Sequence, residues 1–396
     1  MFSGGGGLDL GFEGGFDVIE EAVNGQIHPD WLLNRHNGWV TLPETGFETV
    51  FANDIDVNTA KAWTRYFSKK HNVNGVFHTM SIVDLVKKEL QGENILPSNI
   101  DVVTGGFPCN DFSVAGKRNG FASHRLHDGS LRTTEATEES RGKLYIWMKQ
   151  VVEIVQPKIF YAENVKGLVS LADVKEIIEN DFREISGGYI VVPARVLYAP
   201  DFGVPQTRER VIFIGFKKSA LLPEALRALQ KTNVPQEYDP YPIQTHGTIA
   251  GLLPYTTVAQ ALKDLGEPQD SQDLSHQKYS CAKFMGKHCQ GQKEVDLDSP
   301  GPTIRAEHHG NIEFRRLSRE HGGILQHELD AGLLERRLSV RECARLQTFP
   351  DDYEFVVKNT EPDELDLGLQ PVEKGYFLNS TSGYRIIGNA VPPLLG

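Results

Sequence analysis

The chain has 396 residues, 39% of them hydrophobic, and a formal net charge of −12. This is ordinary globular usage, and it excludes collagen-like, disordered and disulfide-scaffold chains. No apolar run approaches the ~18 residues of a membrane span, and no signal peptide opens the chain. The four cysteines are too few for a disulfide framework, so we expect a cytoplasmic protein. The negative net charge argues against a protein that coats nucleic acid by charge alone, although a local basic face is compatible with it.

The first 216 residues alternate between predicted strands and predicted helices. Short β-branched or aromatic runs predict the strands, and amphipathic patterns predict the helices between them. The strands are expected at Glu48–Ala52, Asp101–Thr104, Lys158–Ala162, Tyr189–Leu197 and Val211–Phe216. The helices are expected at Val57–Phe67, Leu144–Val155 and Val174–Glu184. This alternation predicts an α/β, Rossmann-like, mostly parallel sheet with helices on both faces.

The rhythm is lost from Lys217 to about Arg336, where Pro, Gly, Gln and His are frequent and apolar runs are short. We expect a smaller, irregular second domain there. A helix is predicted at Leu338–Leu346, and Pro350–Glu373 is predicted to be a polar connection. The expected division is therefore 1–216 for the first domain and 217–374 for the second domain and its connection. Residues 375–396 are expected to return to the first domain.

A glycine-rich loop opens the chain, with Phe2 and Ser3 before Gly4, Gly5, Gly6 and Gly7. Glycines between a strand and a helix allow the backbone to approach a nucleotide closely. The spacing does not fit G-x-G-x-x-G cleanly, and a flexible glycine-rich terminus is the alternative. A strand should precede such a loop, but only Met1 and Phe2 stand before it.

Asn53-Asp54-Ile55-Asp56 follows the first predicted strand. A carboxylate at the carboxyl end of a strand often binds a ribose hydroxyl, usually ~20 residues after the glycines. Here about 50 residues intervene, which an insertion over 26–46 would explain. On its own, Asp54 is better explained as a helix cap.

Cys109 and Glu163 follow two further predicted strands. Cys109 ends Gly105-Gly106-Phe107-Pro108-Cys109, where the glycines release the chain and Pro108 stiffens the turn. A thiolate is favoured at such an edge, although a buried structural cysteine is the common alternative. Glu163, in Glu163-Asn164-Val165, could equally be a salt-bridged surface residue. Polar groups at the ends of three strands nevertheless predict one ligand site at the carboxyl edge of the sheet.

Two arginines, Arg208 and Arg210, lie at i and i+2 in Gln206-Thr207-Arg208-Glu209-Arg210. On a strand they would share one face. From there they could clamp an anion or orient Glu163, and an ordinary surface strand pair is the alternative.

Taken in order, these motifs resemble the cytosine-C5 DNA methyltransferase family of bacterial restriction-modification systems. Two more blocks add to the resemblance: the segment 337–350, which reads RLSVRECARLQTFP, and the segment 383–393, which reads GYRIIGNAVPP. The similarity covers the whole chain and keeps the family's order of blocks. It implies a methyltransferase fold with a target-recognition domain, S-adenosylmethionine as cofactor, double-stranded DNA as partner and a monomeric enzyme.

The resemblance also assigns roles to residues. Cys109 is similar to the family's nucleophile, and Glu163 to the glutamate that engages the cytosine. Arg208 and Arg210 occupy the arginine positions beside the flipped base. Residues 110–145 correspond to a loop that closes over DNA; the segment 115–149 carries seven Lys or Arg against four acids, which suits phosphate binding. The resemblance places the cofactor against Phe2, Gly4, Gly6, Asp54, Ile55, Ser81, Pro108, Asn389 and Ala390.

The chain departs from the family pattern in several places. The expected first strand is absent, and the last helix is missing after Gly396, so we expect a chain trimmed at both ends. The adenine-contacting aspartate is replaced by Ser81, unless Asp84 takes its place. The loop is longer than usual, with an insertion over 127–140. Cys281 and Cys289 lack a second close pair, so no metal site is predicted.

Three other functions are alternatives to this interpretation. An RNA cytosine methyltransferase would share the fold, but no tRNA-type signature stands in 217–336. A catalytically silent DNA-binding relative is disfavoured because Cys109, Glu163, Arg208 and Arg210 are intact. A nicotinamide dehydrogenase with a catalytic cysteine leaves the later blocks unexplained.

Overall fold

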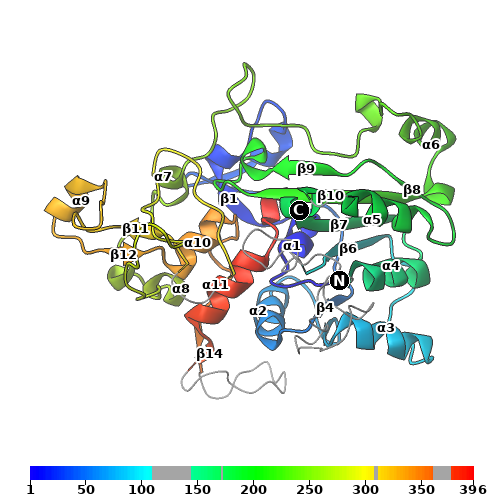
Figure 1. The fold of residues 1–396 in the computed structure, drawn as a ribbon, viewed down its shortest axis with the longest axis horizontal. Helices are drawn as coiled ribbons and strands as arrows, with labels where there is room; N and C mark the ends of the chain where they lie inside the picture. Colours follow the sequence, from blue (N-terminus) through cyan, green and yellow to red (C-terminus); the bar gives the residue numbers. More distant parts are fainter. Residues whose placement is uncertain (109–143, 171–172, 307–310, 360–375) are drawn as a thin grey trace.

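The computed structural model describes residues 1–108, 144–170, 173–306, 311–359 and 376–396. Figure 1 shows the sheet and its helices at one end and a loop-rich part with β11, β12 and α9 projecting at the other. The helices are α1 Gly7–Glu13, α2 Val57–Phe67, α3 Ile82–Leu90, α4 Leu144–Val155, α5 Val174–Arg183, α6 Pro223–Leu229, α7 Val258–Ala261, α8 Leu274–Gln277, α9 Gln326–Asp330, α10 Val340–Leu346 and α11 Ser380–Asn389. The strands are β1 Asp17–Ile19, β2 Asn34–His36, β3 Trp39–Thr41, β4 Ala52–Asp54, β5 Phe77–Thr79, β6 Val102–Gly106, β7 Ile159–Val165, β8 Tyr189–Val191, β9 Arg195–Tyr198, β10 Glu209–Lys217, β11 Phe314–Arg316, β12 Arg336–Arg337, β13 Val357–Lys358 and β14 Tyr376–Leu378.

The larger sheet has the order β6-β7-β10-β8, with β9 also paired to β10. β6 and β7 are parallel, as are β4 and β5 in a separate pair. β10 runs antiparallel to β7, β8 and β9. The sheet is therefore mixed. β9 and β10 can only be antiparallel neighbours, because the connection between them is short and parallel neighbours need a long crossover.

Two predicted strands differ from the observed ones. Tyr189–Leu197 is split into β8 and β9, which pair with successive parts of β10. Pro193 lies at the break, where it has no N–H to donate to a ladder. In Glu48–Ala52 only the last residue belongs to a strand, since pairing with β5 begins at Ala52.

The first three residues lie between the larger sheet and the β4–β5 pair. The Met1 ammonium donates to the Thr104 carbonyl of β6 at 2.7 Å. The Ser3 N–H donates to the Asn53 carbonyl of β4 at 2.8 Å. Because of these bonds, the glycine-rich loop begins at the carboxyl ends of β4 and β6.

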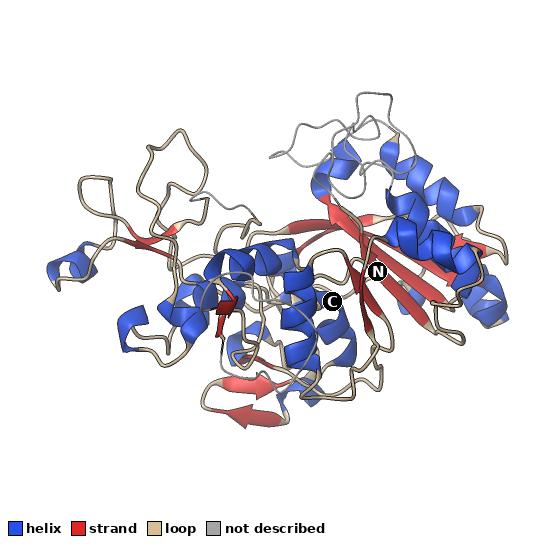
Figure 2. Cartoon of the chain, turned by 90° about the horizontal axis from the view of Figure 1, so that it is seen from below, coloured by secondary structure: helices blue, strands red, loops and turns tan. Residues whose placement is uncertain are grey.

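Both faces of the larger sheet are covered, and β10 shows this most clearly. Val211 and Phe213 pack into a cluster with side chains of α3, α4 and α5, while Ile212 and Ile214 pack with Leu8 and Leu395 on the other face. Figure 2 shows the helical layer beside the strands. Each such fully buried side chain contributes about 1.5–3 kcal/mol, which holds the strand ends, and so the site, in fixed positions.

A third cluster joins α2 to α10 and α11, with Trp63, Phe349 and Ile386 among its members. It packs the last block of the chain against the helix that follows β4. Arg316 of β11 and Arg336 of β12 are both buried, and both form ion pairs with Glu267. In the described part of the chain, no helix is long and apolar enough to cross a membrane.

Candidate active site

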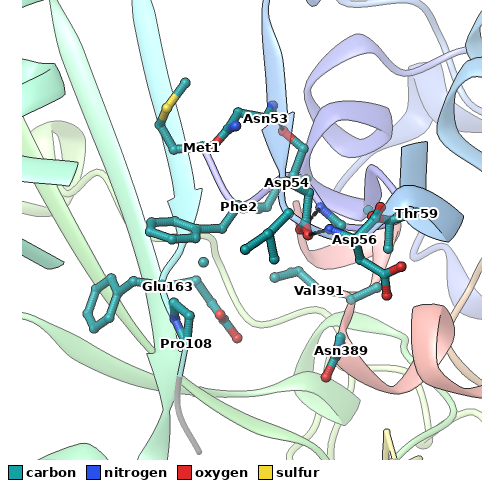
Figure 3. A pocket seen from close by; sticks show the side chains of 18 of the residues that line it. Met1, Phe2, Asn53, Asp54, Asp56, Thr59, Pro108, Glu163, Asn389 and Val391 are labelled. Atoms are coloured by element: carbon teal, nitrogen blue, oxygen red, sulfur yellow. Dashed lines mark hydrogen bonds between the residues drawn. The ribbon is translucent and has the colours of Figure 1, made fainter. Parts of the chain in front are cut away.

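A cavity of about 810 Å³ lies at the carboxyl ends of β4, β6 and β7 (Figure 3). The start of β10 and the end of α11 close it from the other side. The polar ends of several strands thus meet at one edge, as the sequence predicts. Its lining includes Phe2, Gly4, Asp54, Ile55, Ser81, Pro108, Glu163, Arg210, Asn389 and Ala390.

Asp54 holds the glycine-rich loop. Its Oδ2 accepts the Gly4 N–H at 3.0 Å, and its Oδ1 accepts the Asp56 N–H at 2.9 Å. Phe2 and Gly4 both have φ near 53°, a left-handed backbone that turns the chain toward β4. Burial raises the pKa of Asp54, while hydrogen bonds from Asp56 and Gly4 lower it in part.

The helix-cap interpretation of Asp54 is wrong, because Asp56 caps α2. The Asp56 Oδ1 accepts the N–H of Asn58 at 2.9 Å. The other Asp56 oxygen pairs with Arg385 of α11 at 2.5 Å. Asp56 and Arg385 both line the cavity and were missed as site residues. Only the fold could reveal this pair, since the two residues are far apart in the chain.

Ser81, and not Asp84, lies at the cavity. Ser81 is buried, lines the cavity and caps α3 by accepting the Val83 N–H at 3.2 Å. Asp84 is exposed in the first turn of α3, and it does not line the cavity. Asn53, which sequence reasoning also missed, donates to the carbonyls of His78 and Met80, so it fixes the turn that leads to Ser81.

Glu163 and Arg210 form an ion pair on neighbouring strands. The Arg210 Nε lies 2.5 Å from the Glu163 Oε1, and both side chains are about 10% exposed. A Cβ on Gly106 would come within 3.1 Å of the Glu163 Oε2, so glycine keeps space around this oxygen. In Figure 3 Glu163 and Pro108 lie at one end of the cavity, and Asp54 and Asp56 lie across it.

Asn164 fixes the turn that leads to Cys109. Its Nδ2 donates to the Phe107 carbonyl at 3.1 Å, and the side chain is 1% exposed. Pro108 then lines the cavity. Cys109 and the stretch up to residue 143 lie outside the described residues.

Arg208 and Gly6 lie elsewhere than the sequence predicts. Arg208 precedes β10, which begins at Glu209, so it does not share a strand face with Arg210. Its buried guanidinium donates to the carbonyls of Ile304, Gly388 and Ala390, behind the cavity wall. Gly6 packs in the core, where a Cβ would come within 2.6 Å of the ring atoms of Trp63 and Phe67. Neither residue lines the cavity.

Asp9, in the first turn of α1, is a buried carboxyl in the lining of the cavity. Burial raises its pKa to about 6, although the Met1 ammonium and a 2.7 Å hydrogen bond from the Trp63 indole lower it in part. A native pKa above the unfolded value favours the neutral form in the native state. The stabilisation from Asp9 is therefore complete below about pH 4 and is lost as the pH rises to about 6.

Asp9→Asn is expected to remove this pH dependence, because asparagine keeps an acceptor for Trp63 and stays neutral. We expect the variant to be more stable than the wild type at pH 8, by on the order of 2 kcal/mol, and nearly equal to it at pH 4. Urea unfolding across this range measures the difference. Parallel stability profiles for the two proteins would contradict the assignment.

Cys281 is exposed, Cys289 is half-buried and Cys343 is buried. Burial raises the pKa of Cys343. Across the described ranges, no group of three His, Cys, Asp or Glu side chains is arranged to hold a metal ion.

The chain has the fold of solved methyltransferase structures. Two solved structures are similar over nearly the whole chain. A Dnmt2 methyltransferase of S. pombe covers 100% of this chain and 93% of its own, with TM-score 0.53 and 13% identity. A mutant of Spodoptera frugiperda DNMT2 covers 99% of this chain and 95% of its own, with TM-score 0.56 and 14% identity.

The sequence pattern of the C-5 cytosine-specific DNA methylase family matches residues 37–396, and the chain belongs to this family. Type II methyltransferase M.BspRI of Lysinibacillus sphaericus is 31% identical over 403 residues, 100% of this chain and 78% of that protein. Type II methyltransferase M.BsuRI of Bacillus subtilis is 29% identical over 406 residues, which are 100% of this chain and 76% of that protein. The predicted family, fold class and class of enzyme, a DNA cytosine-5-methyltransferase, are thereby confirmed.

Proposed function

We propose that the chain transfers a methyl group from S-adenosylmethionine to carbon 5 of a cytosine flipped out of duplex DNA, as the modification enzyme of a type II restriction-modification system. One observation carries the proposal. The residues of the Glu163–Arg210 ion pair and of the Gly4–Asp54 hydrogen bond line the same cavity. This cavity lies next to the turn that leads to Cys109.

The residues at the Asp54 end of the cavity fit S-adenosylmethionine. Gly4 leaves the loop open, because the nearest atom to an added Cβ would be 4.0 Å away. The Asp54 carboxylate has lone pairs beyond those used by Gly4 and Asp56, so it can accept from ribose hydroxyls. Phe2 and Ile55 offer apolar surface to the adenine, and Ser81 offers a hydroxyl. When bound, the cofactor supplies an electrophilic methyl group.

The other end of the cavity suits the target base. Carbon 5 of cytosine is a poor nucleophile until a thiolate adds to carbon 6, and we assign that addition to Cys109. We assign to Glu163 the engagement of N3 and the amino group of the cytosine, which draws electrons from the ring toward N3. Arg210 holds the carboxylate in position through their ion pair. After carbon 5 takes the methyl group, a base removes its proton, and that electron pair forms the double bond between carbons 5 and 6 as the carbon–sulfur bond breaks. The thiolate leaves, and N3 returns its proton to Glu163.

Duplex DNA is the proposed substrate, and the base must leave the helix because carbon 5 reacts only when its ring faces are accessible. Bisulfite sequencing of DNA from a host that expresses the chain tests this function. Protection of cytosines in one short recognition sequence is the expected result. Full conversion at every cytosine would contradict it. Sedimentation analysis tests the accompanying proposal that the enzyme is a monomer.

Asp54→Ala is expected to weaken cofactor binding. Removal of the carboxylate takes away the acceptor for the ribose and the bond that holds Gly4. A lost hydrogen bond to a charged group costs about 1.5–3 kcal/mol, so the Kd should rise about 10–100-fold. Calorimetric titration with S-adenosylmethionine measures it. Asp84→Ala, on the exposed side of α3, is the control and should leave the Kd unchanged, whereas equal affinities for Asp54→Ala and the wild type would refute this site.

A further inference from the structure

Behind the cavity wall, three buried side chains form a chain of hydrogen bonds that the proposed reaction does not use. Gln206 and Gln347 are 0% exposed, and Arg208 is 1% exposed. Gln206 precedes β10, and Gln347 follows α10 directly. We call these three residues the hub. None of them lines the cavity.

One side of the hub holds the wall of the cavity. Gln347 donates to the Ala390 carbonyl at 2.6 Å. Arg208 donates to the same carbonyl at 2.7 Å and to the Gly388 carbonyl at 3.2 Å. Gly388, Asn389, Ala390 and Val391 all line the cavity. The hub therefore fixes the backbone on which the cofactor side of the cavity is built.

The other side of the hub holds a segment of the predicted recognition domain. Gln206 accepts the Ile304 N–H at 3.0 Å, and Arg208 donates to the Ile304 carbonyl at 3.3 Å. Both backbone groups of Ile304 are thus bound. Two residues further on, Ala306 lines the cavity.

Gln206 and Gln347 connect the two sides. The Gln206 amide donates to the Gln347 side-chain oxygen and, at 3.1 Å, to the Leu346 carbonyl. The two segments also touch directly, since a Cβ on Gly388 would come within 2.2 Å of the Arg305 carbonyl carbon. Movement at Ile304 must therefore be transmitted to the Gly388–Ala390 wall. Interiors packed this closely transmit small shifts.

We propose that Gln206, Gln347 and Arg208 are positioning residues that set the geometry of the cofactor pocket from behind, by holding the Gly388–Ala390 wall in register with Ile304. Gln206 and Gln347 act in series, so breaking either one interrupts the same link to the wall, while the bonds of Arg208 to Gly388 and Ala390 remain. This inference rests on the proposed function, because it takes the cavity to be the S-adenosylmethionine site.

The test measures binding, not turnover, in the full chain. Gln206→Leu, Gln347→Leu and the double variant are titrated calorimetrically with S-adenosylhomocysteine, the demethylated product. We expect each single variant to raise the Kd about tenfold and the double variant to raise it by little more than either one. Interaction in series predicts this lack of additivity. Gln206→Glu, which keeps one oxygen for Ile304 but places an oxygen opposite Gln347, should raise the Kd as well.

Gln156→Leu is the matched control. Gln156 also donates to two carbonyls, those of Glu153 and Ser186, but it directly follows α4 and does not line the cavity. We expect it to lower the unfolding temperature while leaving the Kd unchanged. The hub proposal is overturned if its variants also lower only the unfolding temperature, or if their effects on the Kd add. Failure of the wild type to bind would instead refute the proposed function.

Discussion

Replacement of Cys109 by serine is expected to reduce methyl transfer to duplex DNA by more than about 10³-fold. A thiol with a pKa of ~8.5 supplies some thiolate at neutral pH, whereas a serine hydroxyl supplies essentially no alkoxide. Without addition to carbon 6, carbon 5 stays unreactive. Cofactor binding should be unchanged, since Asp54 and Gly4 hold the other end of the cavity. Transfer of a labelled methyl group, measured in a single turnover, gives the rate.

Covalent trapping tests the same role independently. A duplex with 5-fluorocytosine at the target cannot lose the group at carbon 5 as a proton, so the thiol adduct should persist. We expect the wild type to remain attached to this DNA in denaturing gels and Cys109→Ser to run free. Cys281→Ser is the matched control, because Cys281 is exposed and lies outside the cavity lining. Turnover that survives in Cys109→Ser would contradict the mechanism.

Glu163→Gln is expected to lower the rate of methyl transfer about 10²–10⁴-fold, the usual contribution of a positioned acid or base. The carboxamide has nearly the same shape, but unlike the carboxylate it cannot take up a proton and pass it to N3 of the cytosine. It also loses the charge that pairs with Arg210 at 2.5 Å. The side chain is only 10% exposed, so water cannot readily replace it.

The expected loss of rate in Glu163→Gln comes from the chemical step and not from DNA binding. DNA affinity should stay within about threefold of the wild type, since most of it comes from phosphate contacts. Single-turnover rates and a fluorescence binding titration separate the two quantities. Glu209→Gln is the control: Glu209 begins β10 next to Arg210, but its carboxylate pairs with Lys166 at the surface. Equal rates for Glu163→Gln and the wild type would remove Glu163 from its role.

Local patterns predicted much of the fold. The helices at Val57–Phe67 and Leu144–Val155 agree with α2 and α4 residue for residue, because their apolar positions recur with the helical period and face a buried cluster. The convergence of Asp54, Pro108 and Glu163 at one edge also follows from chain order, since parallel strands end on the same side.

Long-range partners could not be predicted in this way. The i, i+2 spacing predicts that Arg208 shares a strand face with Arg210, but β10 begins only at Glu209. The alternation of side chains does not apply before a strand begins. The Asp56–Arg385 pair and the Gln206–Gln347 bond join distant blocks of sequence, so they become visible only when the blocks are packed together.

In the proposed reaction, one cavity brings a methyl donor and a cytosine ring together so that carbon 5 is methylated. The most direct measurement incubates the purified chain with duplex DNA and S-adenosylmethionine carrying a deuterated methyl group, then digests the DNA to nucleosides for mass spectrometry. We expect deuterium in 5-methyldeoxycytidine with the wild type and its loss with Glu163→Gln. Deuterium in N4-methyldeoxycytidine or N6-methyldeoxyadenosine, or incorporation into RNA in preference to DNA, would contradict it.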